Sequence, residues 1–165
     1  MINRTAPIFF IFAFLAMLLS CATTAIDVIP ITPHDQPISR LVIDTITLES
    51  VYSYSSNQQE LRNTIISSGK NHGFVIENNL LDDTLIDSCT IDFFLREKSY
   101  VEGFKTILST AILAVVYDPD GNILYRISFL HDGKESLTSL RYVRDALNDI
   151  FNSLDKEIRA TEKKL

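Results

Sequence analysis

The two cysteines are the most reactive side chains of this sequence, and their surroundings predict different chemistry. Cys21 directly follows Ser20 at the end of an uncharged apolar run, residues 8–19, which makes it a candidate for covalent modification. Cys89 stands alone in Ser-Cys-Thr-Ile-Asp at the start of an apolar segment. A lone thiol has no partner for an internal disulfide or a metal site. We therefore expect Cys89 to be a small buried hydrophobe.

Acidic residues occur in two places where a cation is conceivable. Residues 118–122, Asp-Pro-Asp-Gly-Asn, alternate carboxyl and amide side chains, but a calcium loop requires glycine at its sixth position and here glycine is fourth. Because the segment joins two expected strands, we predict a hairpin turn in which Gly121 has a positive φ. Asp82, Asp83 and Asp87 could bind a cation or form an acid/base pair, yet the asparagines beside them favour a solvated loop.

No pairing of a nucleophile with a base is evident. His34, His72 and His131 are far apart, and no His-x-x-x-His pair indicates a metal site on a helix. Neither a Gly-x-Ser-x-Gly elbow nor a Ser-x-x-Lys motif with partners occurs. The chain has only five glycines, and they are not spaced as in a phosphate-binding loop. We therefore predict no catalytic residues, no metal and no cofactor.

Residues 1–20 have the organisation of a secretory signal peptide. A short start that contains Arg4 precedes the 12 apolar residues 8–19, and a small residue follows them. A helix that spans a bilayer needs about 20 apolar residues. A transmembrane anchor or a buried helix is therefore the less favoured alternative, and we expect the segment to be removed.

The end of this segment resembles a known processing motif. Leu18-Leu19-Ser20-Cys21 is similar to the lipobox of bacterial lipoproteins. In that family a diacylglycerol is attached to the thiol, the signal is cut before the cysteine, and the new amine can be acylated. The resemblance implies a covalent lipid on Cys21. The residue after it is alanine and not aspartate, which implies export to the outer membrane, facing the periplasm.

The charge of the chain excludes one class of partner. Cleavage after Ser20 removes only Arg4 among the charged residues, so the formal charge falls from −6 to −7. Binding to nucleic acid depends on clustered Lys and Arg, and no basic cluster is present. Without a polybasic patch, the lipid must hold the protein at the membrane. Two or more acyl chains, at about 0.8 kcal/mol per buried methylene, do so stably.

The mature chain of 145 residues is long enough for one domain. Residues 21–39 contain Pro30, Pro33 and Pro37, and we predict that they form a lipidated, extended tether. Within it, residues 26–30 could add a short edge strand. Residues 40–160 form the domain, and residues 161–165 form a polar tail.

Hydrophobic periodicity predicts five strands and two helices within the domain. The strands are residues 40–48, 74–77, 90–95, 105–117 and 123–130. The first helix begins after an Asn57 cap and ends at Gly69 or Gly73, with Leu61, Ile65 and Ser68 on one face. The second helix covers residues 137–158, and its apolar stripe consists of Leu137, Leu140, Val143, Leu147, Ile150, Phe151, Leu154 and Ile158.

The order of elements that we predict is β-α-β-β-β-α, which includes four of the five strand segments. Three consecutive antiparallel strands form a meander, and the first strand–helix–strand unit is a crossover. We predict an α+β, two-layer sandwich with a mostly antiparallel sheet and both helices on one face.

This order, over residues 40–158, is similar to that of a group of envelope lipoproteins. The group includes the lipoprotein of the lipopolysaccharide translocon, the auxiliary lipoproteins of ABC-type lipid-trafficking systems, the CsgG/TolB-N-terminal type and the lipoprotein activators of peptidoglycan synthases. The resemblance implies a non-catalytic subunit that contacts a protein partner or lipid.

The resulting hypothesis is a lipid-anchored accessory or binding subunit in outer-membrane assembly or lipid transport. A regulator of a cell-wall synthase is the first alternative, and a small envelope hydrolase is the second. The expected partner surface is the exposed face of the sheet, or loops that carry Tyr52, Tyr54 and Tyr100, because tyrosine is enriched at interfaces.

Overall fold

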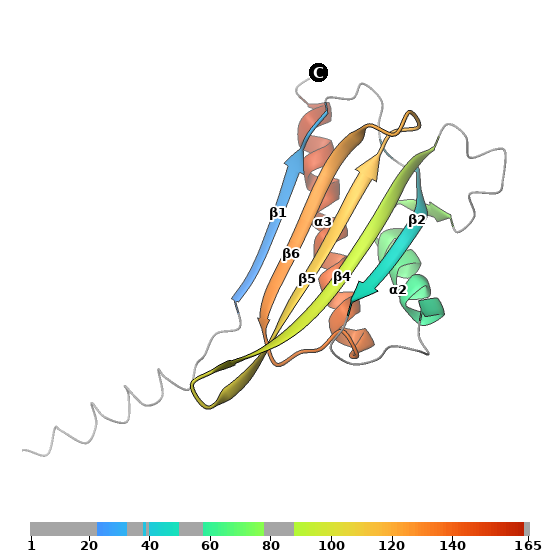
Figure 1. Ribbon diagram of the computed structural model, residues 1–165. Helices are drawn as coiled ribbons and strands as arrows, with labels where there is room; N and C mark the ends of the chain where they lie inside the picture. The colour runs from blue at the N-terminus through green and yellow to red at the C-terminus, as the bar shows by residue number, and fades with distance from the viewer. Residues whose placement is uncertain (1–22, 33–37, 39, 50–57, 78–87, 164–165) are drawn as a thin grey trace, which may run out of the picture.

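The computed structural model describes residues 23–32, 38, 40–49, 58–77 and 88–163. Within them lie six strands and two helices (Figure 1). The strands are β1 (Thr23–Pro30), β2 (Arg40–Glu49), β3 (Val75–Glu77), β4 (Cys89–Glu102), β5 (Lys105–Tyr117) and β6 (Ile123–Gly133). The helices are α2 (Gln58–Asn71) and α3 (Leu140–Glu162).

All six strands belong to one mixed sheet in the order β1-β6-β5-β4-β2-β3. The β4-β5-β6 meander is antiparallel, as predicted. β1 pairs with β6 and is antiparallel to it. β2 is parallel to both β3 and β4. Both helices lie on one face of the sheet, so the predicted α+β two-layer architecture is confirmed (Figure 1).

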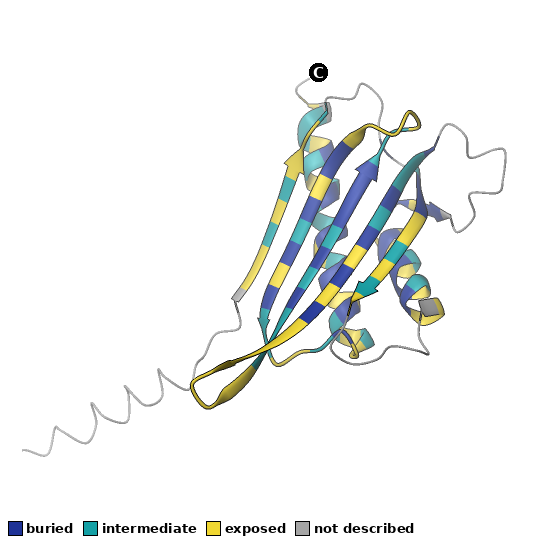
Figure 2. Ribbon diagram, viewed as in Figure 1, coloured by how far each residue is buried: buried dark blue, intermediate teal, exposed yellow. Residues whose placement is uncertain are grey.

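The core lies between the helices and one face of the sheet. Side chains alternate between buried and exposed along β4 and β6 (Figure 2), as the twofold repeat of a strand requires. Apolar residues meet across strands in register, as in the row formed by Ile26, Phe129, Ile112, Leu95 and Leu48. The buried members of such rows pack against the helices and form the core.

Helix α2 buries the predicted face of Leu61, Ile65 and Ser68. It ends at Asn71 and is closed by Gly73, which has a φ of 84°. The N–H groups of Gly73 and Phe74 donate to the carbonyls of Lys70 and Gly69, which is the hydrogen-bond pattern of a Schellman cap. Gly69 has a different role, because a Cβ there would lie 2.5 Å from Cγ1 of Ile76.

Helix α3 buries its predicted stripe, apart from the half-buried Leu140. It begins three residues later than predicted, because Leu137 is buried in the loop that precedes the helix. Ser139 is the N-cap: its hydroxyl accepts a hydrogen bond from the backbone N–H of Tyr142. Asp145 and Asp149 lie off this stripe and are exposed.

The segment predicted as a tether contains a full edge strand. β1 has eight residues and pairs with β6 along its whole length, from Thr23 with Asp132 to Pro30 with Tyr125. Ile26 and Val28 pack against the core. The sequence indicated at most a short strand over residues 26–30. The longer strand forms because β6 offers an unpaired edge next to it, which is not a local property of the segment.

Strand β4 is also longer than predicted, with 14 residues in place of six. Its second half, residues 96–102, contains charged and polar residues that resemble a loop. β5 is long enough to pair with it as far as Glu102 and Lys105, and this pairing completes the strand. Tyr100 therefore lies in a strand and not in the predicted loop.

In the part of the chain that the structure describes, no helix is both long enough and apolar enough to cross a membrane.

Candidate functional site

A row of polar side chains crosses the core face of the sheet at one end. Thr24, His131, Thr110 and Glu97 lie directly opposite one another on β1, β6, β5 and β4. The last three are buried, although the rows that follow along the same face are apolar. Because buried polar groups are costly unless paired, this row is the clearest exception to an apolar core.

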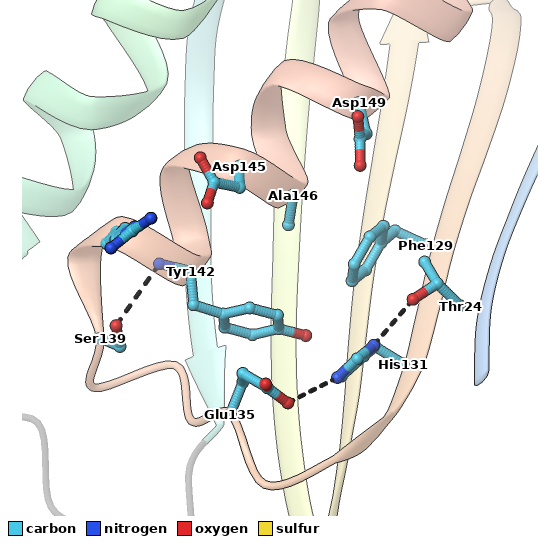
Figure 3. A pocket seen from close by; sticks show the side chains of 10 residues that line it. Thr24, Phe129, His131, Glu135, Ser139, Tyr142, Asp145, Ala146 and Asp149 are labelled. Carbon is cyan, nitrogen blue, oxygen red and sulfur yellow. Dashed lines mark hydrogen bonds and ion pairs between the residues drawn. The ribbon is translucent and has the colours of Figure 1, made fainter. Parts of the chain in front are cut away.

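His131 links three elements of the fold (Figure 3). Its Nε2 lies 2.9 Å from the Glu135 carboxylate, and its Nδ1 lies 2.8 Å from the Thr24 hydroxyl. A carboxylate can only accept, so Nε2 carries the proton, and in the neutral ring Nδ1 accepts from Thr24. The hydrogen bond with His131 lowers the pKa of the Glu135 carboxyl below its ordinary value.

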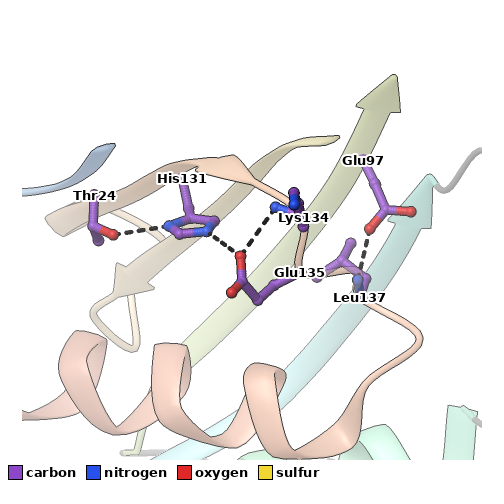
Figure 4. A network of polar contacts seen from close by, with 6 residues as sticks. All are labelled: Thr24, Glu97, His131, Lys134, Glu135 and Leu137. Carbon is purple, nitrogen blue, oxygen red and sulfur yellow. Dashed lines mark hydrogen bonds and ion pairs between the residues drawn. The ribbon is translucent and has the colours of Figure 1, made fainter. Parts of the chain in front are cut away.

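Glu97 holds the loop that leads into α3 (Figure 4). Its buried carboxylate accepts hydrogen bonds from the backbone N–H of Leu137, at 2.6 Å, and from the Ser136 hydroxyl, at 3.1 Å. Charge-assisted bonds of this kind offset the cost of burying the carboxylate. The polar row thus fastens the β6–α3 connection to the sheet at two points, His131 and Glu97.

Tyr142 of α3 lies over this row. Its ring centroid is 5.3 Å from that of His131. Its hydroxyl and the hydroxyl of Thr110 are both buried, and their interaction lowers the pKa of Tyr142, in opposition to the larger effect of burial. Burial raises the pKa of Tyr142 to about 12, helped by the negative charges of Glu135 and Glu97. The tyrosine is therefore a neutral group at physiological pH.

A cavity of about 370 Å³ opens beside the polar row, between α3 and the edge formed by β1 and β6 (Figure 3). Its lining combines Phe129 and Ala146 with charged groups of both signs, Arg141 among them, and with more acidic than basic side chains. Such a mixture suits a small polar ligand better than an apolar one.

The hydrogen-bonded side chains of Thr24, His131 and Glu135 follow one another in the order hydroxyl, imidazole, carboxylate. In hydrolases this order allows the imidazole to remove a proton from a hydroxyl nucleophile. Sequence reasoning missed it, because the three residues come from different elements and the predicted strand 123–130 stops one residue before His131. The signal that could have found it is the length of β5, which requires β6 to continue past Leu130 to His131.

The structure separates the other residues that the sequence singled out. His72 lies in the turn after α2 and stacks on Phe151 with ring centroids 6.5 Å apart. Tyr100 is exposed in β4, on the other face of the sheet from Glu97. Cys21, Tyr52 and Tyr54 lie outside the described residues, and so do His34, Asp82, Asp83 and Asp87.

The Asp118–Asn122 segment is a hairpin turn, and Gly121 has the predicted positive φ, 84°. The Asp118 carboxylate accepts hydrogen bonds from the backbone N–H of Asn122 at 2.7 Å and from its side-chain amide at 2.8 Å. The side-chain hydrogen bond from Asn122 is the main cause of the lowered pKa of Asp118. The carboxylate is therefore already engaged in closing the turn.

Cys89 is half-buried at the start of β4 and packs against the core. Burial raises the pKa of its thiol, and the negative charge of Asp118 adds to the rise. A raised pKa leaves little thiolate at neutral pH, so the environment of Cys89 does not favour a nucleophile.

The face of the sheet away from the helices is not covered by any described element (Figures 1 and 2). Leu130 and Phe94 are exposed on it, and Ala111 and Leu113 lie between them half-buried. Arg96 and Arg126 stand at its rim, the former in an exposed ion pair with Glu49. We call this surface the outer sheet face.

Comparison with known proteins identifies the fold. No family model and no curated protein matches the chain. Two solved structures of PelC from Paraburkholderia phytofirmans, both dodecamers, superpose with TM-scores of 0.55 and 0.54 at 7% identity, over 81% of this chain and 98% of PelC. Lipoprotein GNA1162 from Neisseria meningitidis gives a TM-score of 0.42 at 10% identity, over 69% of this chain and 99% of that one.

Proposed function

We propose that this chain is a lipid-anchored envelope protein that acts without catalysis, as an accessory or binding subunit in outer-membrane assembly or lipid transport. The lipobox-like Leu18-Leu19-Ser20-Cys21 supports the anchor. The observation that carries the proposal is the position of β1, which starts only two residues after Cys21 and is paired from its first residue. A lipid on Cys21 would hold the folded domain directly against the membrane.

The outer sheet face is the proposed surface for a protein partner. Its exposed leucine and phenylalanine, surrounded by charged residues, have the composition of an interface with an apolar centre and a polar rim. PelC, which shares the fold, is a dodecamer. We propose that this chain also works by association with protein.

Two alternatives remain. Regulation of a cell-wall synthase would use the same anchor and the same surface. A small envelope hydrolase is favoured by the Thr24–His131–Glu135 chain. We place the hydrolase last, because these hydrogen bonds also join β1, β6 and the loop before α3, so the fold alone accounts for them.

Lipidation is tested by Cys21→Ala. We expect cells grown with a radioactive fatty acid to label the wild-type protein and not this variant, because the thiol is the site of attachment. Cys89→Ala is the matched control and is expected to keep the label, since it removes the only other thiol. Label retained in Cys21→Ala would contradict the anchor.

The partner surface is tested by Leu130→Glu, which places a charge at a position that is 52% exposed and so should not disturb folding. In pull-downs from detergent-solubilised envelopes, we expect the proteins that accompany the wild type to be reduced. Asn63→Glu adds the same charge to an exposed site on α2 and should leave them unchanged. Identical profiles for both variants would show that the outer sheet face is not the partner surface.

A further inference from the structure

The β4–β5 hairpin continues beyond the rest of the sheet as a two-stranded ribbon (Figure 1). β2 is paired with β4 only as far as Arg96, and β6 with β5 only as far as Leu108. β4 and β5 stay paired out to Glu102 and Lys105. Among the described strands, residues 100–107 therefore have only each other as partners. We call these residues the ribbon tip.

The ribbon tip exposes apolar side chains. Phe104 is fully exposed, Val101 is 72% exposed and Tyr100 is 42% exposed. Gly103, with a φ of 61°, makes the tight turn that places Phe104 at the end of the ribbon. An isolated two-stranded hairpin is marginally stable in water, and clustered exposed apolar groups mark an interaction site. The exposed apolar side chains therefore mark the ribbon tip as an interaction site.

The ribbon tip lies at the end of the sheet where β1 begins (Figure 1). Thr23, the first residue of β1, pairs with Asp132, which in turn pairs with Ser109 at the base of the ribbon. Cys21 is two residues before Thr23, so the chain cannot separate the two by more than about 7 Å. The anchor and the ribbon thus belong to the same end of the sheet, and the Asp118–Asn122 turn lies at the other end (Figure 1).

The dimensions suit a membrane surface. Phe104 lies five positions before Ser109, so the tip extends about 17 Å past the row that contains Thr23. Cys21 reaches at most about 7 Å from that row. With β5 along the membrane normal, the tip would therefore lie at least about 10 Å deeper than the anchored residue. Interfacial protein segments enter a bilayer to a depth of about 5–10 Å.

The charges of the ribbon are compatible with this position. Glu102 lies directly opposite Lys105, so the acidic group nearest the turn has a basic neighbour across the strands. Lysine side chains such as Lys98 and Lys105 can keep their ammonium groups among lipid headgroups while their stems contact apolar surface. Tyrosine favours the same interfacial region.

We propose that the ribbon tip inserts Tyr100, Val101 and Phe104 into the leaflet that holds the lipid of Cys21. This proposal rests on the proposed anchor and adds a second point of contact with the bilayer. Two contacts restrict rotation of the domain about its anchor, so the outer sheet face is presented at a defined angle to the membrane.

The chain contains no tryptophan, so Phe104→Trp introduces a single fluorescent probe at the tip. The full-length gene is expressed in cells, and the purified product is reconstituted in phosphatidylethanolamine–phosphatidylglycerol vesicles. We expect the tryptophan emission to shift to shorter wavelength relative to the protein without vesicles. We also expect it to be weaker in vesicles with brominated acyl chains than in vesicles with unbrominated ones. Ile123→Trp is the matched control, because it places the probe beside the turn at the opposite end of the sheet. Its emission should not respond to brominated lipid.

The mass of the purified protein reports the lipid on Cys21 separately from the fluorescence. Lipidated Phe104→Trp protein without quenching would overturn the tip insertion and leave the anchor intact. Quenching in unlipidated protein would support the tip contact and overturn the anchor. A concentration-dependent shift of the emission without vesicles would assign the tip to a second copy of the chain and overturn its insertion.

Discussion

Leu147→Asp is expected to lower the free energy of unfolding by about 3 to 5 kcal/mol, because it places an unpaired charge in the core. Leu147 is 0% exposed on α3 and belongs to the main hydrophobic cluster. The total stability of a domain of this size is about 5 to 15 kcal/mol. The substitution therefore removes a large share of it. Urea unfolding of residues 22–165, followed by circular dichroism, measures the loss.

Asp149→Ala is the control for this experiment. It lies on the same helix two residues away, but its side chain is exposed, so we expect a change within about 0.5 kcal/mol. At a slope of about 1 to 3 kcal/mol per molar urea, the two midpoints should differ by more than about 1 M. Equal midpoints would mean that the buried face of α3 is assigned incorrectly.

Phe151→Ala is expected to cost about 3 to 5 kcal/mol, the range for removing a buried aromatic ring and leaving a cavity. The ring is 0% exposed, and its centroid lies 5.7 Å from that of Phe74 and 6.0 Å from that of Phe93. It thus joins α3 to the segment after α2 and to the centre of the sheet. The same urea titration measures the effect.

Phe104→Ala provides a matched control, because it deletes the same atoms from a fully exposed side chain. Its stability in solution should match that of the wild type. A loss as large as that of Phe151→Ala would show that the ribbon tip contributes to the core and is not free to contact a membrane.

Local patterns predicted much of this fold. The stripe of α3 and the face of α2 follow from spacings of three and four residues, which depend only on the geometry of a helix. The bounds of β5 and the positive φ of Gly121 also agree with the prediction. In these cases the residues that determine the structure are neighbours in the chain.

The ends of the strands were predicted less well, because strand length depends on the partner. The second half of β4 has charged residues at Arg96, Glu97 and Lys98, and nothing local marks it as a strand. The β5 strand of 13 residues was predicted with its correct bounds. Because β5 pairs with β4, the length of β5 indicates that β4 extends beyond residue 95.

By itself, the sequence determined the signal-like start, the lipobox-like motif at Cys21, the acidic charge and the two amphipathic helices, because each is a property of consecutive residues. Only the tertiary structure decided that residues 23–30 join the sheet, that Thr24, His131, Thr110 and Glu97 form one row, and that the ribbon tip lies at the end of the sheet where β1 begins. The physical reason is that these three facts depend on the register of backbone hydrogen bonds between strands up to about a hundred residues apart. Register sets which side chains meet, and periodicity within one strand sets only which face they occupy.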